Sequence, residues 1–456
     1  MIVKNATELI GNTPMLEIDP SIHGLKNINL FAKLELLNPF GSVKDKTAWN
    51  MLRHEIDGIK ERGQTVIEAS SGNTAKAMQM ICAMNDIPFK IVTNRVRVRE
   101  VKEVLQLLGT EIEELPGQSQ CLDPTDPNDP LFVVEKIMSQ EPDKYFHTSQ
   151  YTNIKNLEAH VEMTGKEIAG DLDKVDYFIG GLGTTGSTRG TGEYLKAHNS
   201  PNLQSIGVVC VKGGLIPGIR NSDEMHEVGL FEKEFYDDIV EVSIDEAIDS
   251  MLALIKSCGV LSGPTGGSSM AGALKYLRTI DDTLTEKKNA VFLVCDRAEW
   301  YLSYMQKYRP ELFGLTRKNS ALNEISQERL QEAPAKSPDE AEAWLAQEDA
   351  PLVIDLRGSL AFKGSHIGGS INIPQESFEE ICENGVPIAE GRKVLFVCPV
   401  GDQSRKFASY FSDLGYECAS LDGGFVAWRD QGKETVKGKR TRSRKRKTLV
   451  SSGSGA

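Results

Sequence analysis

A lysine in a turn is the residue of this chain whose surroundings most clearly suggest chemistry. Lys44 lies in residues 38–46 (NPFGSVKDK), between an apolar run at residues 28–36 and a helix-like stretch at residues 47–56. An amine held in a pocket at such a turn can form an imine with an aldehyde. Because an isolated lysine is usually exposed to solvent, this interpretation depends on the loops that follow.

Two further loops have the composition of anion-binding sites. Residues 68–74 (EASSGNT) join a predicted strand to a predicted helix, where small hydroxyl residues and glycine expose backbone N–H groups that suit a carboxylate. Residues 180–188 (GGLGTTGST) also follow a predicted strand, and their glycines let the backbone wrap a phosphate. Alone, the second loop could equally serve a dinucleotide or be a tight turn. It lacks the Gly-Lys-Ser/Thr ending of a nucleotide P-loop.

Residues 1–312 contain the elements that must position these loops. The predicted strands and helices of this part alternate, with strands at residues 65–68, 89–92, 177–179, 206–210 and 291–295 and helices at residues 76–84 and 98–108. Apolar strands separated by helices predict a mostly parallel α/β sheet. Residues 116–130 contain four prolines and predict a surface loop.

A second α/β pattern follows a polar segment at residues 313–336, which predicts a linker. Strands are predicted at residues 351–356, 393–397 and 417–421 and a helix at residues 404–414, so residues 337–433 suffice for a small independent domain. Residues 434–456 predict a basic, disordered tail. Eight of the residues from Lys437 to Lys447 are basic, but no aromatic residue is interleaved, which disfavours nucleic-acid binding.

The overall composition is that of a soluble globular protein. The 456 residues are 40% hydrophobic and 26% charged, with a net charge of −13. No apolar run is long enough to span a membrane and no signal-peptide region precedes the first loop, so we expect a cytoplasmic protein. The eight cysteines form no CxxC pair and no Cys/His cluster, which favours reduced thiols and no metal site.

The three loops of the first part, in this order, resemble the β-family of pyridoxal-phosphate enzymes, which includes cysteine synthase and cystathionine β-synthase. The resemblance extends from residues 10–14 (IGNTP) to about residue 302 and includes residues 150–153 (QYTN) and 263–268 (GPTGGS). It implies the fold-type II architecture, with two α/β subdomains of mostly parallel sheets. It also implies a pyridoxal 5'-phosphate cofactor, a small-molecule amino-acid substrate and a homodimer.

The resemblance also implies a role for individual residues. Lys44 would form the Schiff base, Asn73 would hydrogen-bond the cofactor's ring oxygen, and Thr265 would face the pyridine nitrogen. The cofactor phosphate would be cradled by Gly183, Thr184, Thr185, Gly186 and Ser187. The substrate carboxylate would be held by Ser70, Ser71, Gly72, Thr74 and Gln150.

These roles imply a β-elimination chemistry. A hydroxyl at Thr265, unlike a carboxylate, does not keep the pyridine protonated, so the ring is a moderate electron sink. Lys44 is positioned as the general base for the Cα proton. Loss of the β-substituent gives an aminoacrylate, to which a thiol or sulfide adds, or from which water releases pyruvate and ammonia. Ala75-Lys76, Lys46 and the sequence GTTGS depart from the usual family pattern and leave the particular substrate open.

Cys398 is the second residue that could do chemistry, although alone it would read as a buried cysteine at the end of a strand. It precedes a predicted helix, where backbone N–H groups can stabilise a thiolate or a persulfide. Residues 355–357 (DLR), 366–374 (HIGGSINIP), 398–404 (CPVGDQS) and 421–428 (LDGGFVAW) resemble a rhodanese domain over residues 337–433. The resemblance makes Cys398 the sulfur-carrying nucleophile and His366 a structural residue.

The rhodanese resemblance places a persulfide loop after the cysteine. Its residues would be Pro399, Val400, Gly401, Asp402, Gln403, Ser404 and Arg405. Pro399 and Gln403 stand where arginines are usual, and Asp402 opposes Arg405, so we expect weak recognition of thiosulfate. A protein persulfide or a polysulfide is an equal alternative as the sulfur donor.

Together the two parts predict β-replacement on an activated serine resembling O-acetylserine. The product would be cysteine or a related β-substituted alanine, and Cys398 would relay sulfane sulfur. The alternative is a cysteine β-lyase that releases sulfide, pyruvate and ammonia, with the rhodanese domain accepting the sulfur. A third class is a sulfur-sensing or scaffold protein that docks through its basic tail, which the intact Lys44 loop argues against.

Overall fold

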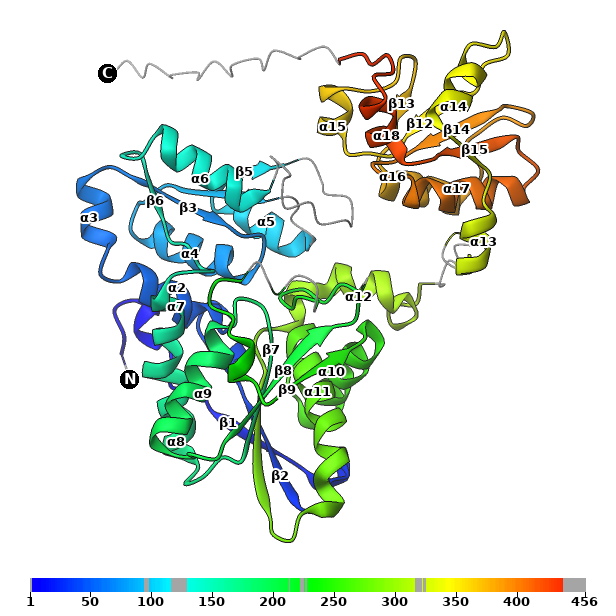
Figure 1. The fold of residues 1–456 in the computed structure, drawn as a ribbon. Helices are drawn as coiled ribbons and strands as arrows, with labels where there is room; N and C mark the ends of the chain where they lie inside the picture. The colour runs from blue at the N-terminus through cyan, green and yellow to red at the C-terminus, as the bar shows by residue number, and fades with distance from the viewer. Residues whose placement is uncertain are drawn as a thin grey trace, which may run out of the picture. The chain divides into compact units, whose positions relative to one another are not determined.

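The computed structural model describes residues 2–93, 98–115, 129–212, 214–221, 225, 228–315, 322 and 325–437. These residues form two compact units, one up to residue 315 and the other from residue 322 (Figure 1). The predicted surface loop at residues 116–130 and the basic tail lie almost entirely outside the described residues. No helix of the described chain is both long enough and apolar enough to cross a lipid bilayer.

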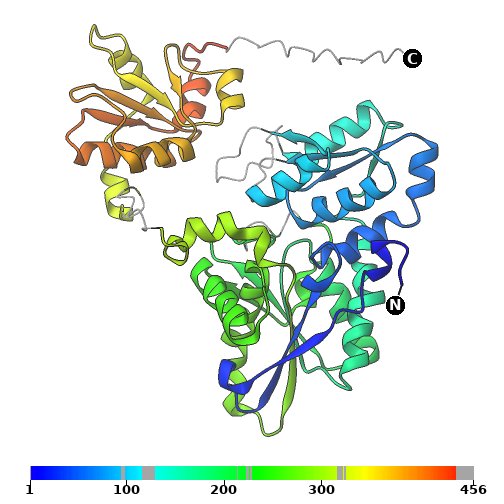
Figure 2. The same cartoon turned by 180° about the vertical axis from the view of Figure 1, so that it is seen from behind.

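The larger sheet of the first unit has six strands. Their order is β1 (Met15–Ile18), β2 (Ile28–Lys33), β10 (Lys288–Leu293), β7 (Tyr177–Gly181), β8 (Gln204–Cys210) and β9 (Asp238–Val242). β1 pairs antiparallel with β2, and every other pairing is parallel. The reverse view shows β1 and β2 in blue across the lower part of this unit (Figure 2).

The strands of the larger sheet are apolar on both faces because helices cover both. Ile179 and Phe292 pack with α10 (Ile244–Cys258) and α11 (Pro264–Ile280) on one face. Phe178 and Val291 pack with α8 (Lys166–Asp171) and α9 (Gly186–His198) on the other. This burial explains the continuous apolar runs of these strands.

The smaller sheet of the first unit is entirely parallel. Its strand order is β5 (Glu111–Glu114), β4 (Phe89–Thr93), β3 (Thr65–Ala69) and β6 (Tyr145–His147). One face packs against α2 (Lys44–Leu52), α3 (Ile56–Glu61), α4 (Asn73–Met84) and α5 (Arg99–Leu107), and the other against α6 (Pro130–Gln140). The predicted pair of α/β subdomains with mostly parallel sheets is therefore confirmed.

Short elements connect the helices and strands of the first unit. They are η1 (Ala6–Leu9), α1 (Pro20–His23), η2 (Glu35–Leu37), α7 (Ile154–Ala159), η3 (His160–Gly165), η5 (Lys233–Phe235), η6 (Asp281–Thr283), η7 (Ala298–Tyr301), α12 (Leu302–Tyr308) and η8 (Pro310–Phe313). The segment η3 is π-helical, whereas the other η elements are 3-10 helices. The helix predicted at residues 47–56 begins earlier, at Lys44, and is interrupted between α2 and α3.

The second unit is a parallel five-stranded sheet. Its order is β11 (Ala335–Lys336), β15 (Cys418–Leu421), β14 (Val394–Val397), β12 (Leu352–Asp355) and β13 (Ile371–Asn372). The helices are α13 (Gln327–Glu332), α14 (Pro338–Leu345), α15 (Ser359–Gly364), α16 (Gln375–Asn384), α17 (Asp402–Asp413) and α18 (Gly424–Asp430). Helices α16 and α17 cover one face, and α14 and α18 cover the other.

The segment predicted as a linker differs from that expectation at its end. Helix α13 and strand β11 both lie within residues 313–336, and β11 adds to the sheet because Ala335 pairs with Ser420. A strand of two residues has too few side chains to show an alternating pattern, so no strand was predicted there.

Candidate active sites at the ends of parallel strands

Lys44 is the first residue of α2, and the loop before it is fixed from two sides. The Asp45 carboxylate accepts a hydrogen bond from the backbone N–H of Phe40 at 2.6 Å. The backbone N–H of Val43 donates to the carbonyl of Cys295, just beyond β10, at 2.8 Å. The smaller sheet's helix α2 and the larger sheet's strand β10 therefore position Lys44 together.

The Lys44 amine points at the glycine-rich loop. Its Nζ donates to the Oγ1 of Thr184 at 3.1 Å, which brings together two residues 140 positions apart. Burial lowers the pKa of Lys44 to about 8. About a tenth of this amine is consequently unprotonated at pH 7, far more than for an ordinary lysine, and the unprotonated form is the one that imine formation and proton abstraction require.

Residues 183–187 form the tight turn after β7 and the first residues of α9. A Cβ atom at Gly183 would lie 2.5 Å from the carbonyl oxygen of Gly218, so the loop tolerates no side chain there. Thr185 adopts a left-handed φ of 65°, and its buried Oγ1 has no hydrogen-bond partner among the described residues. A buried hydroxyl without a partner at a helix N-terminus fits a bound phosphate.

The loop at residues 70–72 joins β3 to α4 and is flanked by a buried polar pair, Thr74 and Gln150. The Thr74 hydroxyl donates to Oε1 of Gln150 at 2.7 Å, and Nε2 of Gln150 donates to the carbonyl of Ala69 at 2.9 Å. Ser70, Ser71 and Gly72 are partly exposed, whereas Thr74 and Gln150 are buried. The residues predicted to hold a carboxylate are thus assembled around one loop.

Asp296 connects the remaining predicted residues. Its carboxylate accepts hydrogen bonds from the Thr265 hydroxyl at 2.7 Å and from Nδ2 of Asn73 at 2.6 Å, and it also contacts the Tyr301 hydroxyl. Burial raises the pKa of Asp296, although these donors oppose the shift. Oδ1 of Asn73 is buried with no partner among the described residues, so the cluster has an unused acceptor.

Asn156 links the carboxylate loop to the glycine-rich loop. Its Nδ2 donates to the carbonyl of Gln150 at 2.8 Å and to the Oγ1 of Thr184 at 3.0 Å. The sequence patterns pointed to neither Asn156 nor Asp296. Asp296 could have been found as a charged residue directly after a predicted apolar strand, but Asn156 lies in a helix with no distinguishing signal.

Cys398 follows β14 in the second unit, inside a closely packed turn. The backbone N–H of Gly401 and the hydroxyl of Ser404 donate to its Sγ at 3.1 and 3.2 Å. Gly401 adopts a φ of 95°, and its added Cβ would lie 2.9 Å from the nitrogen of Gly423. The predicted cradle of turn and helix start therefore exists, with the thiol only 1% exposed.

The electrostatics of this turn differ from the expectation in two ways. Burial raises the pKa of Cys398, and the contributions of Ser404 and Gly401 do not reverse the shift. Asp402 does not pair with Arg405. Its Oδ1 lies 3.5 Å from the Cys398 Sγ, whereas Arg405 forms an ion pair with Asp422 at 2.7 Å. The sulfur therefore lies beside a carboxylate, and the nearest predicted cation is engaged elsewhere.

Other motif residues of the second unit are structural in their contacts. Arg357 binds the Asp355 carboxylate through two nitrogens and lies over the Phe425 ring at 3.5 Å. Nδ1 of His366 donates to the carbonyl of Phe362 at 2.7 Å. The described residues contain no group of three or more His, Cys, Asp or Glu side chains arranged to hold a metal ion.

Comparisons with known proteins divide the chain in the same way. The family model for pyridoxal-phosphate dependent enzymes matches residues 6–296, and the model for rhodanese-like domains matches residues 337–431. Cysteine synthase B of Campylobacter jejuni is 31% identical over 309 residues, which cover 66% of this chain and 97% of that protein. Cystathionine beta-synthase of Apis mellifera is 31% identical over 332 residues, covering 69% of this chain and 63% of that protein.

Solved structures show the same likeness. A hydrogen sulfide-producing enzyme from Fusobacterium nucleatum is 30% identical with a TM-score of 0.57, covering 66% of this chain and 99% of that one. O-Acetyl serine sulfhydrylase isoform 3 from Entamoeba histolytica is 28% identical with a TM-score of 0.56, covering 66% of this chain and 91% of that one.

Proposed function

Because this chain belongs to the family of pyridoxal-phosphate-dependent enzymes, we propose that its first unit catalyses β-replacement on an activated serine such as O-acetylserine. The product is cysteine or a related β-substituted alanine. The similarity to cysteine synthase B and to O-acetyl serine sulfhydrylase supports this reaction class. The observation that carries the proposal is the Lys44 amine, whose pKa is lowered to about 8 and which contacts Thr184 of the glycine-rich loop.

The residues of the first unit fit pyridoxal phosphate. Residues 183–187 would hold its phosphate, and the unused acceptor of Asn73 and the hydroxyl of Thr265 would lie against its ring. When bound, the cofactor supplies a conjugated ring that takes up the electron pair left on the substrate's α-carbon. The Thr265 hydroxyl donates to Asp296 in this structure and would turn its proton to the ring nitrogen when the cofactor binds, because an unprotonated pyridine nitrogen can only accept.

The substrate would be held and deprotonated by residues of three loops. Ser70, Ser71, Thr74 and Gln150 would bind the α-carboxylate of the amino acid. Lys44 would then remove the proton from Cα, since its lowered pKa leaves a useful fraction of the amine as a base. Departure of the acetate-like group and addition of sulfide complete the replacement.

Substitution of Lys44 tests this function directly. Lys44→Ala should abolish formation of cysteine from O-acetylserine and sulfide and should also remove the visible absorbance of the bound cofactor. Lys60→Ala, which alters an exposed lysine of α3, should leave both unchanged. Absence of turnover by the wild-type holoenzyme with O-acetylserine, O-phosphoserine or serine, each with sulfide, would overturn the proposed reaction.

The second unit would relay sulfane sulfur through Cys398. The Cys398 thiolate attacks the outer sulfur of a donor persulfide RSSH, which gives the Cys398 persulfide and releases the thiol RSH. Two molecules of a low-molecular-weight thiol then convert this persulfide to free Cys398, one disulfide and H₂S. The sulfide so released is the nucleophile for the first unit. The carboxylate of Asp402 near Sγ disfavours an anionic donor such as thiosulfate.

A cysteine substitution separates the two activities. Cys398→Ser should abolish sulfide release from a persulfide donor while cysteine synthesis from added sulfide continues. Cys258→Ser, at a partly exposed cysteine of the first unit, serves as the matched control. Retention of sulfide release by Cys398→Ser would exclude this residue as the sulfur carrier.

A cysteine β-lyase is the second candidate, and one comparison favours it. The structure from Fusobacterium nucleatum is described as that of a hydrogen sulfide-producing enzyme and is 30% identical to this chain. With cysteine as the sole substrate, a lyase forms pyruvate and sulfide in equal amounts. Rapid turnover of cysteine alone, with slow turnover of O-acetylserine, would therefore show that the first unit is a lyase and not a synthase.

A further inference from the structure

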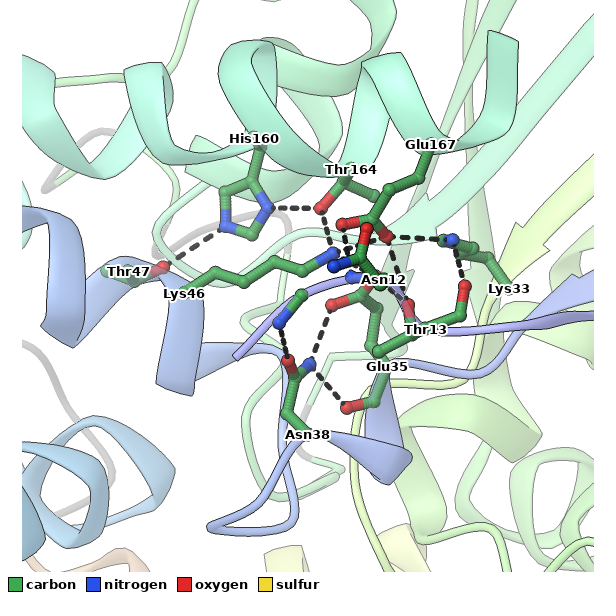
Figure 3. A network of polar contacts seen from close by, with 11 residues as sticks. Asn12, Thr13, Lys33, Glu35, Asn38, Lys46, Thr47, His160, Thr164 and Glu167 are labelled. Carbon is green, nitrogen blue, oxygen red and sulfur yellow. Dashed lines mark hydrogen bonds and ion pairs between the residues drawn. The ribbon is translucent and has the colours of Figure 1, made fainter. Parts of the chain in front are cut away.

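Three buried charged residues and the partly exposed Glu167 form a neutral cluster in the first unit. Nζ of Lys46 lies 2.7 Å from Oε1 of Glu35 and 2.8 Å from Oε2 of Glu167, and Nζ of Lys33 lies 2.8 Å from the same Glu167 oxygen (Figure 3). We call these four residues the ion cluster. None of these four side chains takes part in the hydrogen bonds that join the predicted cofactor-binding and substrate-binding residues.

A row of hydrogen bonds begins at this ion cluster. Nζ of Lys46 donates to the Oγ1 of Thr164 at 3.1 Å, and Thr164 Oγ1 lies 3.0 Å from Nδ1 of His160. Nε2 of His160 lies 3.1 Å from the Oγ1 of Thr47, on the opposite side of the ring (Figure 3). The imidazole therefore bridges Thr164, which contacts the ion cluster, and Thr47 of helix α2.

The row continues to the glycine-rich loop. The Thr47 hydroxyl donates to Oδ1 of Asn156 at 3.1 Å, and Nδ2 of Asn156 donates to the Oγ1 of Thr184 at 3.0 Å. Thr184 also accepts the hydrogen bond from Lys44. The ion cluster is thus connected to the Lys44 amine by side-chain hydrogen bonds alone.

Chemical constraints fix the direction of every bond in this row. The backbone carbonyl of Gln150 can only accept, so the Asn156 amide nitrogen must face it and Oδ1 must face Thr47. A threonine hydroxyl has one proton, and Thr47 gives it to Asn156. Thr47 can then only accept from His160, so the His160 proton is on Nε2.

The other half of the row is fixed by the same reasoning. With its proton on Nε2, His160 presents Nδ1 as an acceptor for the Thr164 hydroxyl, whose oxygen in turn accepts from Lys46. The opposite tautomer would leave one buried acceptor, either Nε2 of His160 or Oδ1 of Asn156, without a donor, which is costly. Burial and the charges of Lys44 and Lys46 hold the pKa of His160 well below its usual value, so the ring is neutral.

The direction of these hydrogen bonds determines where the Thr184 hydroxyl proton can point. Its oxygen accepts two hydrogen bonds, one from Asn156 and one from Lys44, which occupies both lone pairs. Its own proton is left to donate, and the loop around it presents the other features of an anion site. The hydroxyl is therefore oriented before any ligand arrives.

The backbone around His160 is adapted to this contact. His160 begins the π-helical segment η3, and such wide turns occur frequently at functional sites. Helix α9 approaches closely through Gly190, where an added Cβ would lie 2.3 Å from the carbonyl of Leu157 and 3.1 Å from the Cβ of His160. The position of the imidazole is consequently tightly restricted.

We propose that His160 is a positioning residue for the cofactor phosphate. As the Nε2–H tautomer it donates to Thr47 and thereby holds Thr47 and Asn156 in the directions that the Gln150 carbonyl requires, so that Thr184 turns its hydroxyl proton toward the phosphate. This inference rests on the proposed role of residues 183–187 as the phosphate-binding loop. It assigns His160 no contact with substrate or cofactor.

Two substitutions at position 160 distinguish loss of the hydrogen-bond donor at Nε2 from loss of the size of the imidazole ring. A glutamine amide can place an N–H near the position of Nε2, whereas an asparagine amide reaches only the position of Nδ1. His160→Gln should bind pyridoxal phosphate within about threefold of wild type, and His160→Asn should bind it about tenfold or more weakly, the loss expected for one hydrogen bond to an anion. The affinity is measured by absorbance titration of the apoprotein, and the 31P NMR shift of the bound phosphate should change in the asparagine variant only.

The controls use the same unit of the molecule. His23→Gln alters another buried histidine, whose Nδ1 accepts from the backbone N–H of Leu25, and should leave affinity and 31P shift unchanged. If the His160 variants fail to fold, Thr47→Val and Thr47→Ser decide the question. The valine variant should lose affinity and the serine variant should keep it.

The inference would be overturned if His160→Asn or Thr47→Val bound pyridoxal phosphate with the wild-type affinity and the wild-type 31P shift. An equal loss in His160→Gln and His160→Asn, accompanied by equal binding of Thr47→Val and Thr47→Ser, would also overturn it. Cofactor binding is measured without substrate. A wild-type protein that binds the cofactor but does not use O-acetylserine would therefore refute the proposed reaction and not this role of His160.

Discussion

At the scale of single residues, burial acts in opposite ways on the two side chains that we propose to be reactive, Lys44 and Cys398. Removal from water disfavours whichever form of a group is charged. For Lys44 the disfavoured form is the ammonium, so burial lowers the pKa to about 8 and makes the amine a better nucleophile and base. For Cys398 the disfavoured form is the thiolate, so burial raises the pKa and keeps the sulfur unreactive until its surroundings change.

The pKa of Lys44 predicts how cofactor capture depends on pH. Only the unprotonated amine adds to an aldehyde, so the rate at which the apoprotein captures pyridoxal phosphate should rise with pH and level off above about pH 8. An ordinary lysine would show a rate that still rises toward pH 10. Stopped-flow absorbance measures the rate, and a profile still climbing at pH 9.5 would contradict the assignment.

The neighbours of Cys398 predict two opposite shifts of its reactivity. The Asp402 carboxylate raises the pKa of the thiol and the Ser404 hydroxyl lowers it. Asp402→Asn should therefore speed alkylation of Cys398 by iodoacetamide at pH 8, and Ser404→Ala should slow it, each by about three- to tenfold. Mass spectrometry of the peptide containing Cys398 follows the reaction. Changes of the same sign in both variants would show that access, and not the pKa, controls this thiol.

The sequence indicated which candidate residues lie close together, but not their charge partners. Lys44, Thr184, Thr74 and Gln150 belong to recognisable loops, and the structure brings them together. The pairing of Arg405 with Asp422 could not be read from the sequence, because the two lie 17 positions apart on separate elements.

At the scale of elements, the candidate sites lie where strands meet helices. The loops after β3, β7 and β10 bring together the residues proposed to bind a carboxylate, the glycine-rich turn and Asp296. The loop after β14 does the same for Cys398 in the second unit. Parallel strands end at a common edge of their sheet, which explains why distant segments of the sequence supply neighbouring side chains.

The tight turn after β7 yields a prediction for glycine substitutions. Gly183→Ala would place a methyl group 2.5 Å from a backbone carbonyl that cannot move aside, so the loop must distort. We expect pyridoxal phosphate to bind at least about tenfold more weakly, while the fold is retained. Gly170→Ala, in α8 with open space at its Cβ, should leave the affinity unchanged. Equal affinities of both variants would show that this turn does not hold the cofactor.

The central strands of both units, such as β7, β10 and β14, were predictable because they are rich in apolar residues, whereas β5 (EIEE) and β9 (DIVEV) carry acidic residues and were not predicted. The exact beginning of α2 was not predictable either, since Lys44 precedes the helix-like residues and its helical backbone is set by contacts of Asp45 and Val43. The row from Lys46 to Thr184 was equally hidden. It joins residues of α2, α7, η3 and a loop, and its partners are more than 100 positions apart in several steps.

At the scale of the whole molecule, the chain consists of two compact units with separate hydrophobic cores. The core clusters that surround β3 and β10 contain only residues of the first unit, and those that surround β14 contain only residues of the second. A unit with its own core can unfold independently of its neighbour.

Calorimetry should therefore resolve two unfolding transitions in the full chain. Pyridoxal phosphate stabilises only the folded state that binds it, so the cofactor should raise the midpoint of one transition by several degrees and leave the other unchanged. In Lys44→Ala the rise should be much smaller. A single transition, or an equal shift of both, would indicate that the two units unfold as one.

Thr185 has a consequence for redesign of the enzyme. A left-handed backbone costs a threonine about 1 kcal/mol, but a glycine in its place would gain a similar amount of conformational freedom in the unfolded chain. The two effects nearly cancel, so thermal stability alone gives no reason to prefer either residue. A screen that selects only for heat resistance would therefore accept either residue at this position and could lose the hydroxyl that we propose to bind the cofactor phosphate.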